Sequence, residues 1–115
     1  MHRIEGSELV SKRDTKSRLR RSIIDAWEGR CAYCDCRPDK ITLDHVVPKA
    51  KGGTTERCNL VPACAPCNVS KGHCDVWEWY QLQPLHTAQR EQRIRAWIEA
   101  GGISIIDQTE MREDL

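Results

Sequence analysis

Four polar side chains between residues 44 and 68 have the types and the spacing of a site that hydrolyses phosphodiesters. Asp44 and His45 are adjacent, Asn59 follows in the next segment, and Asn68 comes directly after a pair of cysteines. Such hydrolysis needs an activated water, a cation at the charged phosphoryl oxygens and stabilisation of the leaving oxygen. A histidine can act as general base because its ordinary pKa lies near physiological pH. We therefore expect His45 to activate water, while Asp44 and Asn68 offer the oxygen ligands that Mg2+ or Mn2+ prefers.

The position of Asn59 and the geometry of the preceding strand decide whether these side chains can act together. We expect the amide of Asn59 to hydrogen-bond loop backbone and so to hold His45 in place. Neighbouring residues of a strand point to opposite faces, so Asp44 and His45 reach one substrate only where the strand ends, bulges or bends. Pro48, shortly downstream, favours an irregular end of the strand.

Two Cys-x-x-Cys units frame this group. Two thiolates separated by two residues can reach one ion, and two such pairs with 29 residues between them match a tetrahedral zinc site. Four thiolates leave no open coordination position, so we expect a structural zinc whose binding energy is folding energy. The expected ligands are Cys31, Cys34, Cys64 and Cys67. Cys36 is a nearby thiol that can take the place of Cys34.

The number of cysteines indicates the compartment. The chain has seven, whereas a secreted disulfide framework usually uses an even number. The charged N-terminus has no apolar leader, and no run of about 18 apolar residues predicts a membrane span. Paired cysteines in such a chain favour metal binding in a reducing compartment. We therefore expect a cytoplasmic protein, in the host cytoplasm if it is phage-encoded.

Periodicity and punctuation predict the elements that carry these residues. β-branched residues before Pro48 indicate a strand, and Pro66 suits the first turn of a helix that places Cys67 and Asn68 at its start. Apolar residues at helical spacing, with capping residues before them, predict the other helices. The expected helices cover residues 14–28, 75–83 and 88–100, and the expected strands cover 40–47, 59–62 and 103–106.

Length and charge bound the organisation. With 115 residues the chain suggests one domain, and a core this small benefits from a metal staple. The net charge is +3 over residues 1–30, +1 over 31–75 and −3 over 76–115. A basic patch for nucleic acid is thus expected in the N-terminal third and the central loop. We divide the chain into a flexible arm (1–13), a single domain (14–106, motif core 30–73) and a polar tail (107–115).

These motifs resemble those of a known family. Three motifs carry the resemblance: Asp-His-Val-Val-Pro-Lys-Ala-Lys-Gly-Gly at 44–53, Asn59-Leu60, and Cys64-x-x-Cys67-Asn68-x-x-Lys71-Gly72. Over about residues 30–73 the chain closely resembles the HNH endonucleases. In its third motif position the chain has Asn68, where many members have His. This departure favours Mg2+ or Mn2+ over softer metals, and it leaves His73 as an alternative ligand.

The resemblance implies an α+β fold: a small ββα-metal core of the HNH, or His-Me finger, type with a four-cysteine zinc site and flanking helices. It implies DNA cleavage that leaves 5′-phosphate and 3′-hydroxyl ends, with Asn59 ordering the loop and the base. Phage packaging or restriction proteins are the partners that it suggests. We expect contacts to nucleic acid from Lys71, and more weakly from Lys49 and Lys51.

Two other functions use parts of the same sequence. A non-catalytic zinc module that binds nucleic acid or a protein would keep the four cysteines and the basic N-terminal helix, but it would not need Asp44, His45 and Asn68 as a set. An RNA nuclease of the same fold would use the same residues, and only its substrate would differ.

Overall fold

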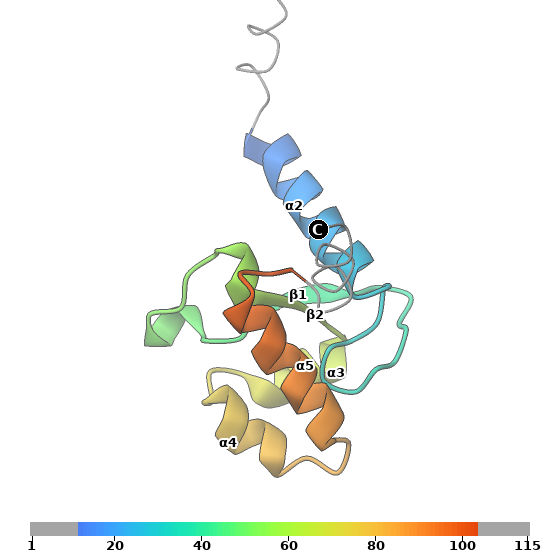
Figure 1. Cartoon of the computed structure of the whole chain (residues 1–115), viewed down its shortest axis with the longest axis vertical. Coiled ribbons are helices and arrows are strands. Elements are labelled where there is room, and N and C mark those ends of the chain that lie inside the picture. Colours follow the sequence, from blue (N-terminus) through green and yellow to red (C-terminus); the bar gives the residue numbers. More distant parts are fainter. Residues whose placement is uncertain (1–11, 104–115) are drawn as a thin grey trace, which may run out of the picture.

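A two-stranded antiparallel sheet with helices packed around it forms the centre of the molecule (Figure 1). The structure is a computed structural model that describes residues 12–103. Strands β1 (Thr42–His45) and β2 (Leu60–Ala63) pair so that Asp44 lies opposite Val61 and His45 opposite Leu60. Helix α3 (Ala65–Lys71) follows β2 almost at once. The expected small α+β fold is confirmed.

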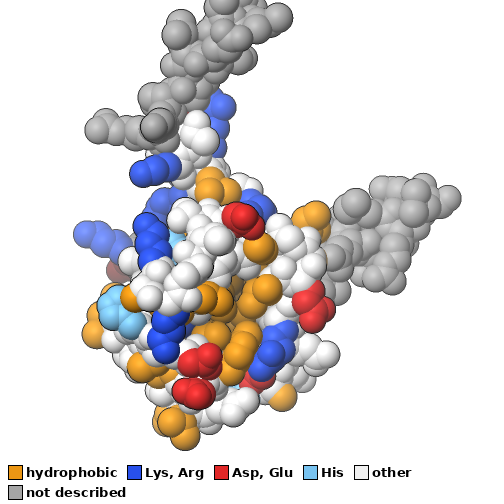
Figure 2. Space-filling view, turned by 90° about the vertical axis from the view of Figure 1, so that its left-hand side faces the viewer, with side chains coloured by type: hydrophobic (Ala, Val, Ile, Leu, Met, Phe, Trp, Pro, Cys, Tyr) orange, Lys and Arg blue, Asp and Glu red, His pale blue; other side chains and the backbone are white. Residues whose placement is uncertain are grey.

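Helix α2 (Lys12–Ala26) corresponds to the segment predicted at 14–28, but it begins and ends two residues earlier. Ile23 and Trp27, on the predicted apolar face, are buried. The chain leaves the helix through Glu28 and Gly29, both with positive φ, and the Gly29 amide donates to the Ile24 carbonyl. Gly29 therefore ends this turn of the chain after the helix, because glycine takes this conformation at little cost. The first half of α2 stands clear of the body and carries exposed Lys and Arg side chains (Figures 1 and 2).

Strand β1 is shorter than the predicted segment 40–47. The Val46 amide still donates to the Asn59 carbonyl, and side-chain hydrogen bonds replace the ladder from Val47 on. The Val47 amide donates to Asn59 Oδ1 at 2.8 Å, and Asn59 Nδ2 donates to the Val47 carbonyl at 3.1 Å. Asn59 was expected in the second strand, but it ends the short 3-10 helix η2 (Arg57–Asn59) instead. The sheet therefore ends at His45, as a joint action of Asp44 and His45 requires.

The remaining helices close the core over the sheet. Helices α4 (Val76–Gln81) and α5 (Ala88–Glu99) lie within the predicted segments. Trp79 and Tyr80 are buried, each with its ring centroid within 6 Å of the Tyr33 ring centroid in an edge-to-face arrangement. Trp97 Nε1 donates to the Leu60 carbonyl, so α5 is tied to β2.

Some predictions fall at or beyond the described residues. Ile103 is in no strand, and the rest of the strand expected at 103–106 lies outside the described residues, as do the tail at 107–115 and nearly all of the arm at 1–13. Within residues 12–103, no helix is long and apolar enough to cross a membrane.

Candidate functional site: a histidine beside a buried aspartate

Asp44 lies at the centre of the candidate site and is only 6% exposed. Its Oδ2 accepts a hydrogen bond from the Tyr33 hydroxyl at 2.6 Å and lies 3.0 Å from the ammonium of Lys71. A buried carboxylate is stable only when it is paired and hydrogen-bonded, and both conditions are met here. The strand therefore points Asp44 into the interior with its orientation fixed from two sides.

Lys71 comes from the last turn of α3 and is fully buried. Its ammonium also donates to the His45 carbonyl at 2.9 Å, so it holds the end of β1 as well as Asp44. A contact with nucleic acid, which the sequence predicts for Lys71, needs a side chain at the surface. The structure instead gives Lys71 an internal role as the counter-ion of Asp44.

Tyr33 is a site residue that the sequence analysis missed. It lies between the first two cysteines, is fully buried, and its carbonyl accepts hydrogen bonds from the Tyr80 hydroxyl and from Arg90 Nε. Burial, together with the neighbouring Asp44 carboxylate, raises the pKa of Tyr33 well above its ordinary value, so the hydroxyl stays protonated as a donor. No local pattern distinguishes this tyrosine from a packing residue, because its partner is eleven residues away.

His45 ends β1 beside a cavity of about 220 Å3. Burial and the positive charge of Lys49 lower the pKa of His45 below 6.5, although Asp44 opposes this shift. The imidazole is therefore neutral near pH 7 and able to accept a proton. The residues that line the cavity are Leu43, Asp44, His45, Pro48, Lys49, Asn68, Gly72 and His73.

This cavity brings together three of the four predicted site residues, since Asp44, His45 and Asn68 all line it. Asn68 Nδ2 donates to Thr42 Oγ1 at 2.9 Å, which uses the nitrogen of the amide and leaves its oxygen as the atom that can bind a cation. His73, the alternative ligand, lines the same cavity. Of the two expected loop lysines, Lys49 lines the cavity, and Lys51 is exposed on the same 3-10 helix η1 (Lys49–Lys51).

Asn59 does not line the cavity but holds the loop beside it. Besides its two bonds to Val47, Nδ2 donates to the Thr54 carbonyl at 2.7 Å. The loop is tight at Gly53, where a Cβ would lie 1.7 Å from the Val47 carbonyl oxygen. Glycine is thus required for this close approach. The loop carries Thr55, whose Oγ1 lies 3.4 Å from His45 Nε2.

The donor set fits a hard divalent cation. Each carboxylate oxygen has two lone pairs: Oδ2 takes the Tyr33 hydroxyl and the shorter contact with Lys71, and Oδ1 accepts one long hydrogen bond from Lys71 at 3.4 Å. Asp44 Oδ1 and the Asn68 amide oxygen can therefore serve as protein ligands, with water completing the shell, as is usual for Mg2+.

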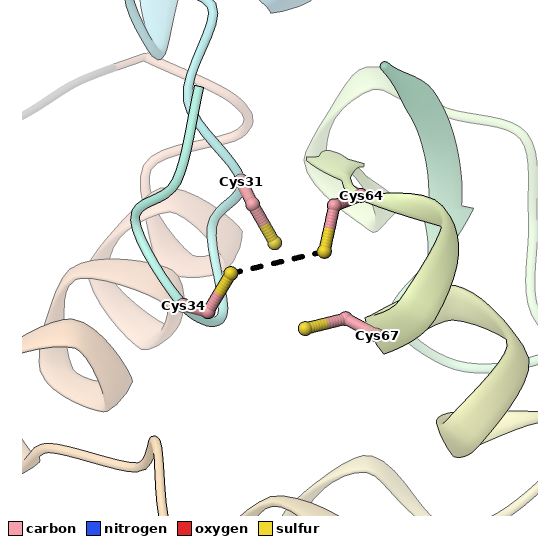
Figure 3. Close-up of side chains that lie close together, drawn as sticks. All are labelled: Cys31, Cys34, Cys64 and Cys67. Atoms are coloured by element: carbon pink, nitrogen blue, oxygen red, sulfur yellow. Dashed lines mark hydrogen bonds between the residues drawn. The ribbon is translucent and has the colours of Figure 1, made fainter. Parts of the chain in front are cut away.

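The four predicted cysteines form a second cluster. Cys31 and Cys34 approach from the turn before β1, and Cys64 and Cys67 from the start of α3 (Figure 3). All four sulfur atoms lie within 4.8 Å of one another, and the Cys34 and Cys64 sulfurs are 3.7 Å apart. A tetrahedron with bonds of about 2.3 Å has edges of about 3.8 Å, so the spacing suits zinc.

The remaining thiols lie outside this set of four. The side chain of Cys36 is exposed overall. Partial burial of its thiol and hydrogen bonds with Cys34 and Cys64 raise the pKa of Cys36 to about 12. Cys74 is exposed, and Cys58 is half-buried with its sulfur 3.9 Å from a Glu56 carboxylate oxygen. The geometry therefore selects Cys34 over Cys36 as the fourth member of the cluster.

The buried pair of Asp44 and Lys71 yields a stability prediction. We expect Lys71→Met to lower the free energy of unfolding by about 3–5 kcal/mol, because it leaves a buried carboxylate without its cation. The double variant Asp44→Asn/Lys71→Met removes both charges and should be less destabilised than Lys71→Met alone. Urea unfolding of zinc-loaded protein measures both.

The matched control is Lys49→Met, which removes an exposed lysine at the same cavity and should change stability by no more than about 0.5 kcal/mol. Equal unfolding midpoints for Lys71→Met and wild type would contradict the assigned ion pair.

Comparisons with known proteins agree with this geometry. Residues 31–73 match the HNH endonuclease family. The chain is 33% identical over 87 residues to the CRISPR-associated endonuclease Cas9 of Corynebacterium diphtheriae, a match that covers 68% of the chain and 8% of that protein. It is 37% identical over 73 residues to the Cas9 of Actinomyces naeslundii, covering 58% of the chain and 7% of that protein.

The matched family segment holds every residue of both clusters, from Cys31 at its start to His73 at its end. It also contains the sheet, α3 and the ion pair of Asp44 with Lys71. The chain spans less than a tenth of the length of these two relatives, so the likeness concerns one domain of them. Residues 31–73 of this chain are an HNH endonuclease domain.

Proposed function

We propose that the protein is a metal-dependent endonuclease that hydrolyses phosphodiester bonds of DNA and leaves 5′-phosphate and 3′-hydroxyl ends. The observation that carries the proposal is the cavity, which gathers a neutral histidine and two oxygen donors within an HNH domain. A general base next to a cation site is what phosphodiester hydrolysis requires.

His45 acts as the general base and takes a proton from the attacking water. Its lowered pKa keeps the imidazole unprotonated at neutral pH. Asn59 holds the loop that follows β1, and this loop presents Thr55 to the His45 ring. The ring is thereby oriented towards the cavity from the loop side.

Asp44 and Asn68 hold the catalytic divalent cation, Mg2+ or Mn2+. When bound, the cation supplies Lewis-acid stabilisation of the charged phosphoryl oxygens. Tyr33 and Lys71 orient the Asp44 carboxylate, as outer partners orient ligands in metal sites generally. Lys49, at the cavity, and Lys51, on the same 3-10 helix, are the lysines placed to contact the DNA backbone.

Zinc is the ion that the four-cysteine cluster is proposed to hold, in a structural role. Burial raises the pKa of Cys31 to about 11, so this thiolate needs a cation beside it. A reducing compartment such as the cytoplasm keeps these thiols available. Packaging or restriction proteins of phages are the partners proposed from the family resemblance.

The competing function is a zinc module that binds without cleaving. It is disfavoured because it gives no reason for a histidine with a lowered pKa to share a cavity with Asp44 and Asn68. An RNA nuclease has the same site, so both substrates belong in the assay.

The first prediction about activity concerns the general base. His45→Ala should reduce nicking of supercoiled plasmid at least about 10²-fold in Mg2+ or Mn2+, since general base catalysis contributes about 10²–10⁴. The readout is conversion to nicked and linear DNA, with single-stranded RNA assayed in parallel. His86→Ala, a histidine outside the cavity, is the control and should retain activity.

Folded, zinc-loaded wild type that cleaves neither DNA nor RNA with any divalent metal would support the non-catalytic module. A fully active His45→Ala would contradict the base assignment.

The second prediction concerns pH. Lys49 lowers the pKa of His45, so Lys49→Gln should raise it. The base is active when deprotonated, hence activity is lost as pH falls through this pKa, and the acid limb of the pH–rate profile should move to higher pH. Lys51→Gln, on the same 3-10 helix, is the matched control and should leave the limb in place. A shift in the opposite direction would contradict the electrostatic assignment.

The third prediction concerns the cluster. Cys64→Ser should lower the zinc content below one ion per chain and depress the melting temperature, because metal binding supplies folding energy. Cys74→Ser, an exposed thiol outside the cluster, should change neither quantity. Elemental analysis and thermal unfolding test both; a Cys64→Ser protein with full zinc and an unchanged melting temperature would show that the cluster is misassigned.

A further inference from the structure

The exposed half of helix α2 carries a surface that the proposed catalytic chemistry does not use. Among the described residues, the second half of this helix packs on the body through Ile23, which is 0% exposed, and is followed by Trp27, which is 3% exposed. From residue 14 to residue 18 every side chain is exposed. Figure 1 shows this half rising beyond the sheet and α5. An overhanging half-helix receives little stabilisation from packing, so its sequence calls for another reason.

Helix α2 has a strong excess of positive charge. Its fifteen residues include six basic and two acidic ones, a net charge of +4. The basic residues are Lys12, Arg13, Lys16, Arg18, Arg20 and Arg21. The arginines of α5 differ, because they contact groups of the body: Arg90 donates to the Tyr33 carbonyl, Arg93 covers the Trp27 ring, and Arg95 covers the Trp77 ring.

One face of α2 changes character along the helix. Lys16, Arg20, Ile23 and Trp27 follow one another at spacings of four, three and four residues, which places them on a single face. Where this face meets the body it is apolar and buried, and where it overhangs it is basic and exposed. An ordinary solvated surface has no reason to continue the core-facing stripe with two cations.

These two cations also oppose the helix itself. Like charges four residues apart destabilise a helix. Lys16 and Arg20 form such a pair on α2. A polyanion on this face would relieve this repulsion.

Arg20 joins this basic face to the catalytic strand. Its Nη2 donates to the Ile41 carbonyl at 2.6 Å, directly before β1 begins at Thr42. Four residues separate Ile41 from His45, and at about 3.3 Å per residue this distance is roughly 13 Å. Phosphates of one DNA strand advance about 3.4 Å each along the duplex axis, so roughly four nucleotides bridge the two positions. Figure 2 shows Lys and Arg side chains continuing from α2 down one edge of the body.

We propose that α2 is a phosphate-binding arm, and that Lys16 and Arg20 contact the backbone of the DNA substrate, with Arg20 about four nucleotides from the bond that is cut. The proposal rests on the proposed function for the identity of the bound polyanion. Contacts of this kind bind without sequence preference and weaken with salt, because they release condensed counterions. The arm therefore extends the substrate contact of a site whose own cavity is small.

The experiment measures binding separately from cleavage. A fluorescent 30-base-pair DNA duplex is titrated with zinc-loaded His45→Ala protein without added Mg2+ or Mn2+. The Kd is followed by anisotropy from 50 to 200 mM salt. We expect Lys16→Gln/Arg20→Gln, made in this background, to raise the Kd severalfold and to reduce the slope of log K against log salt by about 1.8, which is 0.9 for each lost phosphate contact.

The matched control is Arg18→Gln/Arg21→Gln, which removes the same charge from the same helix away from this face. It should change the slope much less. Circular dichroism and thermal unfolding verify that both double variants keep the fold. In the cleaving protein, Lys16→Gln/Arg20→Gln should raise KM with little change in kcat, because it removes binding remote from the reacting bond.

The outcomes separate this proposal from the nuclease assignment. Equal salt slopes for the two double variants, or no binding of DNA by folded protein, would overturn the arm whether or not wild type cleaves. A slope that falls only for Lys16→Gln/Arg20→Gln supports the arm, even if wild-type protein fails to cleave and the catalytic proposal is lost.

Discussion

Four sulfur atoms from two distant segments lie where one metal ion could join them, between the turn before β1 and the start of the helix after β2, and the candidate site depends on this junction. Tyr33 lies inside the turn that carries Cys31 and Cys34. Lys71 lies one helical turn beyond Cys67 on α3. Bringing the two pairs of cysteines together therefore also places a hydroxyl donor and an ammonium next to the same carboxylate. In a chain with a small core, such a cross-link can supply much of the folding energy.

The site combines an inward-facing carboxylate with an accessible base. Asp44 is desolvated, and it stays oriented because Tyr33 and Lys71 satisfy it. His45 lies at the end of the strand, where the pairing stops because Asn59 takes the backbone groups of Val47. Adjacent residues that would face apart in a longer strand thus line one cavity. Burial, together with the charges of Lys49 and Lys71, lowers the pKa of His45 and so favours its neutral form.

Electrostatics acts on two length scales in this molecule. Within the site, charges are buried, paired and close, so they fix geometry more than they attract ligands. On α2 the charges are exposed and mostly positive, and such charges act over roughly a Debye length. The contact between Arg20 and Ile41 is where the two regions meet.

The sequence by itself determined the kinds of chemistry and most of the elements. Local signals were enough for these features, because each depends on residues within a few positions of one another. They are the Cys-x-x-Cys spacing, the Asp-His pair, the glycine after α2 and the periodicity of the helices. It also indicated that Asn59 would bind loop backbone, and the structure shows those bonds to Val47 and Thr54.

Only the tertiary structure decided which polar groups meet. The partners of Asp44 are 11 and 27 residues away in the chain, so nothing local marks Tyr33 as a hydroxyl donor or Lys71 as a buried counter-ion. The same holds for Arg20, which reaches a carbonyl 21 residues away. Any sequence pattern predicts that a lysine lies at the surface, because its charge can be buried only where the fold places an acidic group next to it.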